Sequence, residues 1–372
     1  MLKPDRLVSL DAFRGATVAA MILVNNPGSW GAVYPPLLHA HWNGCTPTDL
    51  IFPFFLFIVG MSIHFAYQKR LPEGLTKKVF LKVLKRTLII FALGIVMAWF
   101  PVFSLERLSH VRVPGVLQRI SLVFFFCTWI YFKTKWLTQI RIASILLVGY
   151  FLLMTLVPVP GIGAANLEPE TNLGAWLDRL LLDGHLWAQS KTWDPEGILS
   201  TIPAIATGIL GMLAGQLFSK LEGQESRTTW LFFIGCVLSL AGWTWGLFFP
   251  INKSLWTSSY VLYTAGLAMQ AFACCYLLFD MVGLKKWATP LTYYGTNAIF
   301  VFVASGLLAK TLIRIKVREG AEEISLWSFI YKNAYASWLP PKDASLAFAV
   351  TLILFFLVIL GQMYKRKIFV KV

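Results

Sequence analysis

Apolar stretches long enough to cross a lipid bilayer recur along this chain, and they constrain its fold more than any other feature. A helical run of about 18 apolar residues covers the hydrocarbon core of a membrane. Of the 372 residues, 57% are hydrophobic and only 14% are charged. A soluble protein of this size could not bury all the apolar surface that such a composition carries. We therefore predict an all-α integral membrane protein with ten crossings, at residues 8–27, 48–67, 83–102, 115–132, 139–157, 198–219, 229–249, 257–281, 289–311 and 344–363.

The distribution of Lys and Arg predicts the orientation of these crossings. One side of the membrane carries roughly twice as many Lys and Arg residues as the other, and both tails, with Lys3, Arg6 and Lys371, belong to that richer side. The positive-inside rule places both termini in the cytoplasm. The net charge of +15 then forms a cytoplasmic collar that faces anionic lipid. We expect no nucleic-acid binding, because no soluble basic domain is present.

Two long connections are expected on the external side, at residues 158–197 and 312–343. The second carries Arg314, Lys316 and Arg318, against the positive-inside rule, but long connections cross with less regard to charge. Residues 326–331 within it read as a short helix at the membrane interface. No internal repeat or soluble domain interrupts the chain, so we expect one transmembrane domain over residues 1–372.

The cysteines indicate neither a disulfide framework nor a metal site. Four of the five, Cys127, Cys236, Cys274 and Cys275, lie in apolar runs, and only Cys45 lies beside polar residues. None has metal-ligand spacing to a histidine. The N-terminal apolar stretch contains Asp11 and Arg14 and no small-residue cleavage site, so we do not expect a cleaved signal peptide.

The connection between the first two crossings contains two histidines, His39 and His41. Histidine changes its charge near neutral pH and is the most common general base. A loop histidine is as often merely solvated, but these two are followed by Asp49 at the start of a helix. Asp49 could cap that helix or orient a histidine tautomer, and the sequence leaves both roles open.

Ionisable groups inside crossings need polar partners. Asp11 and Arg14 are three residues apart on one helical face, so they could neutralise each other; alternatively, Arg14 contacts an anionic ligand. Arg119 lies a few residues inside the fourth crossing, where we expect it to face a polar cavity.

Further polar residues are expected at the external face, together with His39 and Asn43. Tryptophans at such positions more often belong to an interfacial belt than to a ligand site. The convergence of these polar residues nevertheless predicts a site for a hydroxyl-rich substrate, and the sequence leaves open whether that substrate is neutral or cationic. The additional residues are Asp194, Glu196, Asn252 and Trp256, with Asn297 inside the ninth crossing.

With these motifs in view, the sequence resembles the catalytic membrane domain of the heparan-alpha-glucosaminide N-acetyltransferase family. The resemblance runs in order over nearly the whole chain and matches the family's ten helices. It rests on residues 9–15, 24–25, 39–44, 49–60, 112–119, 194–199, 252–260 and 297. The family's active histidine, in the setting His-Ala-x-Trp-Asn-Gly, falls on His39, and its active-site asparagine falls on Asn25; the lysosomal enzyme has no histidine at the position of His41.

The resemblance implies acetyl transfer from cytoplasmic acetyl-CoA to an amino sugar across the inner membrane of a bacterium. His39 would be the base or the acyl carrier, with Asn25, Asn43 and Asp49 as further catalytic residues. Cations and a neighbouring amide would hold the phosphates of CoA at the cytoplasmic mouth, namely Arg14, Arg119, Gln118, Arg86 and Lys85. Acceptor contacts would come from His41, Trp42, Asp194, Glu196, Asn252, Trp256 and Asn297.

Several alternatives stay open at this point. Direct transfer and an acetyl-histidine intermediate fit the same residues. The sequence lacks the family's large lumenal N-terminal domain, so we expect a smaller acceptor than heparan sulfate, and the resemblance also implies a homodimer. A permease for N-acetylglucosamine or a related sugar is the second reading, although we find no inverted repeat. A purely structural membrane scaffold fits these polar motifs poorly.

Overall fold

The computed structural model describes residues 7–370, which fold into two compact helical units. The first unit holds the chain up to His39, residues Thr46–Ile51 and the chain from Cys274 onward, and the second holds Ala40–Cys45 and Phe52–Ala273. Three cations of the expected cytoplasmic collar, Lys3, Arg6 and Lys371, lie outside the described residues.

The first unit is built around α1, whose backbone lies against α11. Gly15 lies on the backbone of Leu291, and Gly295 on the backbone of Asp11, so a methyl group at either glycine would clash. Small residues at such crossings let helices approach closely in a membrane. The elements of this unit are α1 (Val8–Asn25), 3-10 turns at Pro35–Leu37 and Pro47–Leu50, a π-helical turn at Leu277–Met281, α11 (Lys285–Thr296), α12 (Ala298–Arg314), β1 (Lys316–Glu319), β2 (Glu322–Ser325), α13 (Leu326–Tyr331), a second π-helical turn at Lys332–Ala336, and α14 (Pro341–Lys365).

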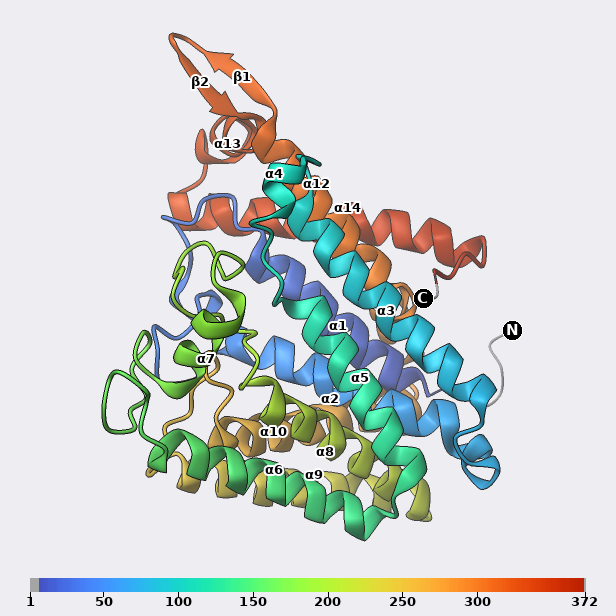
Figure 1. Ribbon diagram of the computed structural model, residues 1–372. Coiled ribbons are helices and arrows are strands. Elements are labelled where there is room, and N and C mark those ends of the chain that lie inside the picture. The colour runs from blue at the N-terminus through green and yellow to red at the C-terminus, as the bar shows by residue number, and fades with distance from the viewer. Residues whose placement is uncertain (1–6, 371–372) are drawn as a thin grey trace. The chain divides into compact units, whose positions relative to one another are not determined.

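The second unit is a bundle in which α6, α8, α9 and α10 lie side by side (Figure 1). Gly60 and Gly211 bring α2 and α8 into backbone contact. Its elements are α2 (Ile51–Tyr67), a 3-10 turn at Gln68–Glu73, α3 (Lys77–Trp99), α4 (Leu105–Leu108), α5 (Val116–Lys133), α6 (Trp136–Leu156), α7 (Leu173–Leu182), α8 (Thr201–Lys220), α9 (Gln224–Trp245) and α10 (Ser258–Tyr276).

Eight helical spans in the described part of the chain are long and apolar enough to cross a membrane, and a ninth is obtained if α11 and α12 count as one broken span. The prediction of a polytopic helical membrane protein is therefore confirmed. Helix α3 coincides with the third expected crossing but does not belong to these spans. Its first half carries the cations Lys77, Lys78, Lys82, Lys85 and Arg86.

The expected crossing at 289–311 is not one straight helix. Helices α11 and α12 meet at Asn297 with a bend of 71°. The buried side chain of Asn297 donates to the carbonyl oxygen of Ile368 at 3.2 Å and accepts from the backbone N–H of Val370 at 2.8 Å. The bend is thus tied to the C-terminal segment of the same unit, and Asn297 is engaged there by the backbone.

Both long connections contain regular secondary structure. Residues 326–331 form α13, the short helix expected there, and β1 pairs with β2 in an antiparallel hairpin that was not predicted (Figure 1). In the 158–197 connection, Asn172 caps α7 by accepting from the N–H of Ala175 at 2.9 Å.

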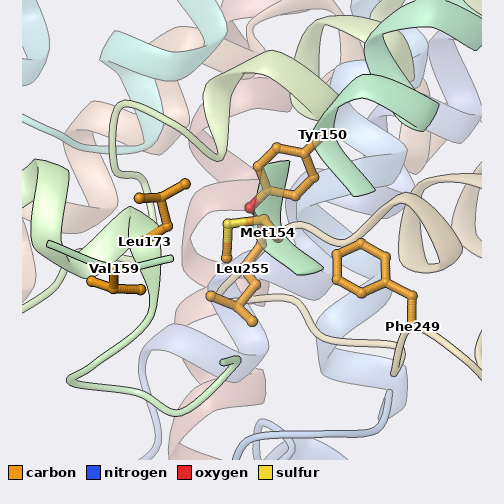
Figure 2. Close-up of a cluster of buried hydrophobic side chains, with 6 residues drawn as sticks. All are labelled: Tyr150, Met154, Val159, Leu173, Phe249 and Leu255. Atoms are coloured by element: carbon orange, nitrogen blue, oxygen red, sulfur yellow. Dashed lines mark hydrogen bonds between the residues drawn. The ribbon is translucent and has the colours of Figure 1, made fainter. Parts of the chain in front are cut away.

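A buried apolar cluster supports this connection in the second unit (Figure 2). It contains Tyr150, Met154, Val159, Leu173, Phe249 and Leu255. The Tyr150 hydroxyl donates to the carbonyl oxygen of Leu255 at 2.6 Å. Trp42 and Leu167 pack against the same cluster, which joins residues 40–45 to the 158–197 connection.

Candidate active site

The imidazole of His39 lies against a buried carboxylate. Its Nδ1 is 2.7 Å from Oδ1 of Asp49; the His39 side chain is 50% exposed and that of Asp49 only 1%. The other carboxylate oxygen, Oδ2, accepts from the backbone N–H and the hydroxyl of Thr46, each at 3.0 Å. Thr46 and Asp49 form a reciprocal capping box at the helical turn Pro47–Leu50. Asp49 therefore both caps the helical turn and contacts the ring of His39, which are the two roles that the sequence left open.

This arrangement determines which imidazole nitrogen can act as a base. A carboxylate at Nδ1 accepts a hydrogen bond from the ring and holds the neutral tautomer that carries its proton there. The lone pair is then at Nε2. Because Thr46 fixes the carboxylate, the ring direction is set by a buried group, which is the usual way that a base is oriented.

Residues 40–45 are held by the second unit. The indole N–H of Trp42 donates to the carbonyl oxygen of Leu167 at 3.0 Å, and the N–H of Gly44 donates to the carbonyl oxygen of Ile251 at 2.7 Å. The exposed Asn43 accepts from the amide of Asn252 at 3.1 Å. The structure thus brings together two of the amides that the sequence placed at one face.

Asp194 and Glu196 are paired with an arginine. Nε and Nη2 of Arg112 donate to the two carboxylate oxygens of Asp194 at 2.8 and 2.6 Å, and Nη2 also donates to Glu196. Burial disfavours the charge on Arg112, but the hydrogen bonds and charges of the two carboxylates outweigh it and raise the pKa of Arg112. Asp194 and Glu196, which were expected to contact the substrate, are therefore both engaged by Arg112.

Arg119 also contacts the turn after Asp194. Its guanidinium donates to the carbonyl oxygens of Pro195 at 3.0 Å and Gly197 at 3.1 Å, and to the hydroxyl of Ser200. Arg119 lies in the first turn of α5, beside a connection expected to be external. Nη1 and Nη2 of Arg119 are thus engaged by the 194–200 turn, and the expectation that Arg119 holds the phosphates of CoA stays a prediction.

The ring of Trp256 and the side chain of Gln118 are also used inside the second unit. Trp256 is buried, lies 5.1 Å from the Arg119 guanidinium and donates to Thr207 at 3.1 Å. The buried Gln118 lies against Gly94 of α3. Both side chains pack in the core, which leaves Trp256 poorly placed to contact a substrate.

Lys85 and Arg86 are exposed on α3, and the guanidinium of Arg86 lies 4.8 Å from the ring centre of Phe124. Contacts of Gly94 with Gln118 and of Arg86 with Phe124 show that α3 and α5 run antiparallel. These two cations stay compatible with phosphate binding.

In the first unit, Arg14 donates to Asp11 at 3.0 Å and to the carbonyl oxygen of Gly295 at 3.2 Å. The ion pair predicted from their spacing is therefore present. Asn25 ends α1 with an exposed side chain, and His41 is exposed in the loop.

Sequence reasoning did not assign roles to Arg112 and Asp178. Asp178 is buried on α7 and accepts from the backbone N–H of Ile198 at 2.9 Å, and burial raises its pKa to about 6. The sequence did show two signals for these residues: Arg112 lies just before a crossing, and Asp178 lies in a Gly- and Pro-rich connection. Their pairing depends on tertiary contacts far apart in sequence.

A family model described as heparan-alpha-glucosaminide N-acetyltransferase, catalytic, matches residues 6–232. Heparan-alpha-glucosaminide N-acetyltransferase of Mus musculus is 32% identical over 363 residues, covering 82% of this chain and 54% of the relative. The Homo sapiens protein of the same name is 32% identical over 357 residues, covering 81% and 52%. The chain spans about half the length of the curated relatives it matches.

Proposed function

Because this chain belongs to the heparan-alpha-glucosaminide N-acetyltransferase family, we propose that it transfers an acetyl group from cytoplasmic acetyl-CoA to the amine of a glucosamine-type sugar. The observation that carries the proposal is the His39–Asp49 contact in a multi-pass membrane protein. We place the protein in a bacterial inner membrane, with both termini cytoplasmic and the sugar on the periplasmic side.

The proposed reaction needs a base and a stabilised oxyanion. The amine nitrogen attacks the thioester carbonyl and its proton moves to Nε2 of His39. The C–S bond then breaks, and the leaving thiolate of CoA takes that proton back from His39, so that free CoA thiol and the neutral imidazole result. In the acetyl-histidine scheme, Nε2 itself attacks first and the amine then takes the acetyl group. Asn25, which belongs to the same unit as His39, supplies an amide donor for the developing oxyanion. Lys85 and Arg86 are the candidate cations for the phosphates of CoA.

Release of free CoA tests this proposal. The purified chain, supplied with acetyl-CoA and glucosamine, should release CoA thiol. His39→Ala should abolish that release while leaving the melting temperature unchanged. His110→Ala is the matched control, because His110 is an exposed histidine with no role in the proposed reaction, and it should retain the rate. Near-wild-type turnover by His39→Ala would overturn the assignment of His39.

Thermal stabilisation separates the enzyme from the alternative permease. A ligand that binds only the folded state raises the melting temperature as its concentration exceeds Kd. CoA should therefore stabilise the protein, whereas a sugar permease would not respond to CoA.

A further inference from the structure

Three half-buried tryptophans of the second unit meet in T-shaped, edge-to-face contacts. The ring centres of Trp42 and Trp193 are 5.1 Å apart at an interplanar angle of 76°, and those of Trp187 and Trp193 are 5.6 Å apart at 64°. They belong to the 40–45 segment and the 158–197 connection. Trp230 of α9, by contrast, is 48% exposed on a helix that is long and apolar enough to span the membrane. The three clustered tryptophans therefore pack against other protein side chains. A tryptophan of an interfacial belt, in contrast, contacts mainly lipid and water.

The guanidinium of Arg112 binds Asp194, the residue that follows Trp193 in the chain. Its bidentate contact with Asp194 fixes the backbone on one side of the ring, and the hydroxyl of Ser190 donates to the carbonyl oxygen of Trp193. Planar, bidentate pairs add geometric specificity as well as energy. Arg112 therefore holds the side chain of the residue that follows Trp193 in the chain.

The carboxylates beside the tryptophans already have a cationic partner. The exposed Asn43 follows Trp42 in the chain, and its side-chain oxygen accepts a hydrogen bond from Asn252. The amide nitrogen of Asn43 carries two N–H groups. The carboxylates of Asp194 and Glu196 are paired with Arg112. An ammonium group would therefore find no unpaired carboxylate among these residues, whereas a neutral hydroxylated ring would find aromatic surface and amides.

We propose that Trp42 and Trp193 form the surface on which the sugar ring of the acceptor stacks, with Asn43 contacting its hydroxyls and Arg112 as a positioning residue for Trp193. This inference rests on the proposed acetyltransferase function. It specifies that the acceptor is a pyranoside recognised through its C–H face and hydroxyls, with the amine in its neutral form. That form suits the reaction, because only an unprotonated amine has the lone pair that attacks a thioester.

Two substitutions of Trp193 test the stacking surface. Trp193→Leu keeps apolar bulk but removes the aromatic face, and it should raise KM for glucosamine on the order of tenfold. Trp193→Phe keeps an aromatic face and should raise KM by less than about threefold. The KM for acetyl-CoA and the kcat should stay near wild type in both, as they should in the control Trp230→Leu. Equal glucosamine KM values for the leucine and phenylalanine variants would overturn the proposal.

Arg112→Lys tests the positioning role. Lysine cannot reproduce a bidentate fork, so the glucosamine KM should rise while the acetyl-CoA KM does not. In the Trp193→Leu background, Arg112→Lys should have no further effect, because the ring that it positions is gone. Additive effects would show that Arg112 acts elsewhere and would remove it from the proposal.

Binding without turnover separates this inference from the proposed function. N-acetylglucosamine should change the intrinsic tryptophan fluorescence of the wild-type protein and of Trp193→Phe at similar concentrations, and that of Trp193→Leu only at higher ones. If the wild type released no CoA but showed this order of binding, the acetyltransferase function would fail and the sugar surface would stand. If CoA release were normal and the three proteins bound N-acetylglucosamine alike, the sugar surface would fail alone.

Discussion

At the scale of residues, the contact between His39 and Asp49 combines an accessible ring with an inaccessible carboxylate. A half-exposed imidazole can meet a substrate, while a carboxylate that is 1% exposed keeps its hydrogen bonds away from competing water. Thr46 satisfies the second carboxylate oxygen. Asp49 therefore caps a short helical turn and also orients His39, the proposed base.

Asp49→Asn should lower kcat by roughly 10²-fold or more, because the amide no longer accepts reliably from Nδ1 and the tautomer that exposes the Nε2 lone pair is no longer favoured. The KM for acetyl-CoA should change little. Steady-state kinetics at saturating acetyl-CoA, together with the melting temperature, measures both effects.

Thr46→Ala separates the two roles of Asp49. It removes the hydroxyl, whose single hydrogen is shared between Asp49 and the carbonyl oxygen of Leu38, but it keeps the carboxylate beside His39. It should cost about 1 kcal/mol of stability and much less activity than Asp49→Asn. Equal losses of activity would mean that Asp49 matters only as a cap.

The sequence pointed to single residues better than to their partners. His39, Asp49 and the Asp11–Arg14 spacing were visible because their partners lie within ten residues or one helical turn. Arg112 and Asp194 are 82 residues apart, and no local pattern indicates that they pair. A buried carboxylate in a loop therefore looked like a ligand for the substrate until the structure supplied its arginine.

At the scale of elements, the turn between Asp194 and Ser200 is held from three directions. Arg112 binds its carboxylates, Arg119 binds its carbonyl oxygens, and Asp178 of α7 accepts from the N–H of Ile198. Charged groups in such buried positions are stable only when they are hydrogen-bonded. The 158–197 connection is thus a fixed part of the second unit, which suits a proposed binding surface.

Asp178 should make the stability of this element depend on pH. Burial raises its pKa to about 6, whereas an unfolded chain titrates an aspartate near 4. Between these values the folded state holds a proton that the unfolded state has lost, so stability is highest at low pH and falls as pH rises through about 6. The shift corresponds to roughly 3 kcal/mol.

Asp178→Asn should remove this dependence, because the amide stays neutral and can still accept from Ile198. Melting temperatures between pH 4 and pH 7.5 should fall with pH in the wild type and change less in the variant. Asp183→Asn, at an exposed position after α7, should keep the wild-type slope. A variant slope equal to that of the wild type would assign the dependence to another group.

Hydropathy predicted where helices lie but not how they bend. Expected spans and observed helices overlap at all ten places, because each apolar run is long. The bend at Asn297 and the β1–β2 hairpin were not predicted. A hydropathy window of about 19 residues averages over a single asparagine, so the bend leaves no signal in it. The bend depends on bonds from Asn297 to Ile368 and Val370, which sequence periodicity does not show.

At the scale of the whole molecule, the apolar surface left outside the helices requires lipid. Helix α9 is the clearest case, with only 17% of its apolar window buried. Its exposed side chains include Trp230, Phe233, Leu240 and Trp243. Water would penalise this surface by roughly 25 cal/mol for each Å², so the arrangement is stable only in a membrane.

Helix α3 decides whether the chain crosses that membrane ten times. Its 23 residues span about 35 Å, and it runs antiparallel to α5, whose length and hydropathy suit a crossing. Its cations gather in the first half, as expected for a helix that begins in the cytoplasm. We therefore propose that α3 crosses and that its two ends lie on opposite sides.

Single cysteines at exposed Lys78 and Glu106 test this proposal in a variant without native cysteines. Intact cells treated with a membrane-impermeant maleimide should label Glu106→Cys, which follows α3, and not Lys78→Cys, which lies in its first turn. Permeabilised cells, as the control, should label both. Because a helix that crosses must separate its two flanks, labelling of both positions in intact cells, or of neither, would mean that α3 does not cross. Labelling of Lys78→Cys alone would retain the crossing and reverse the orientation, which would place the His39 loop in the cytoplasm.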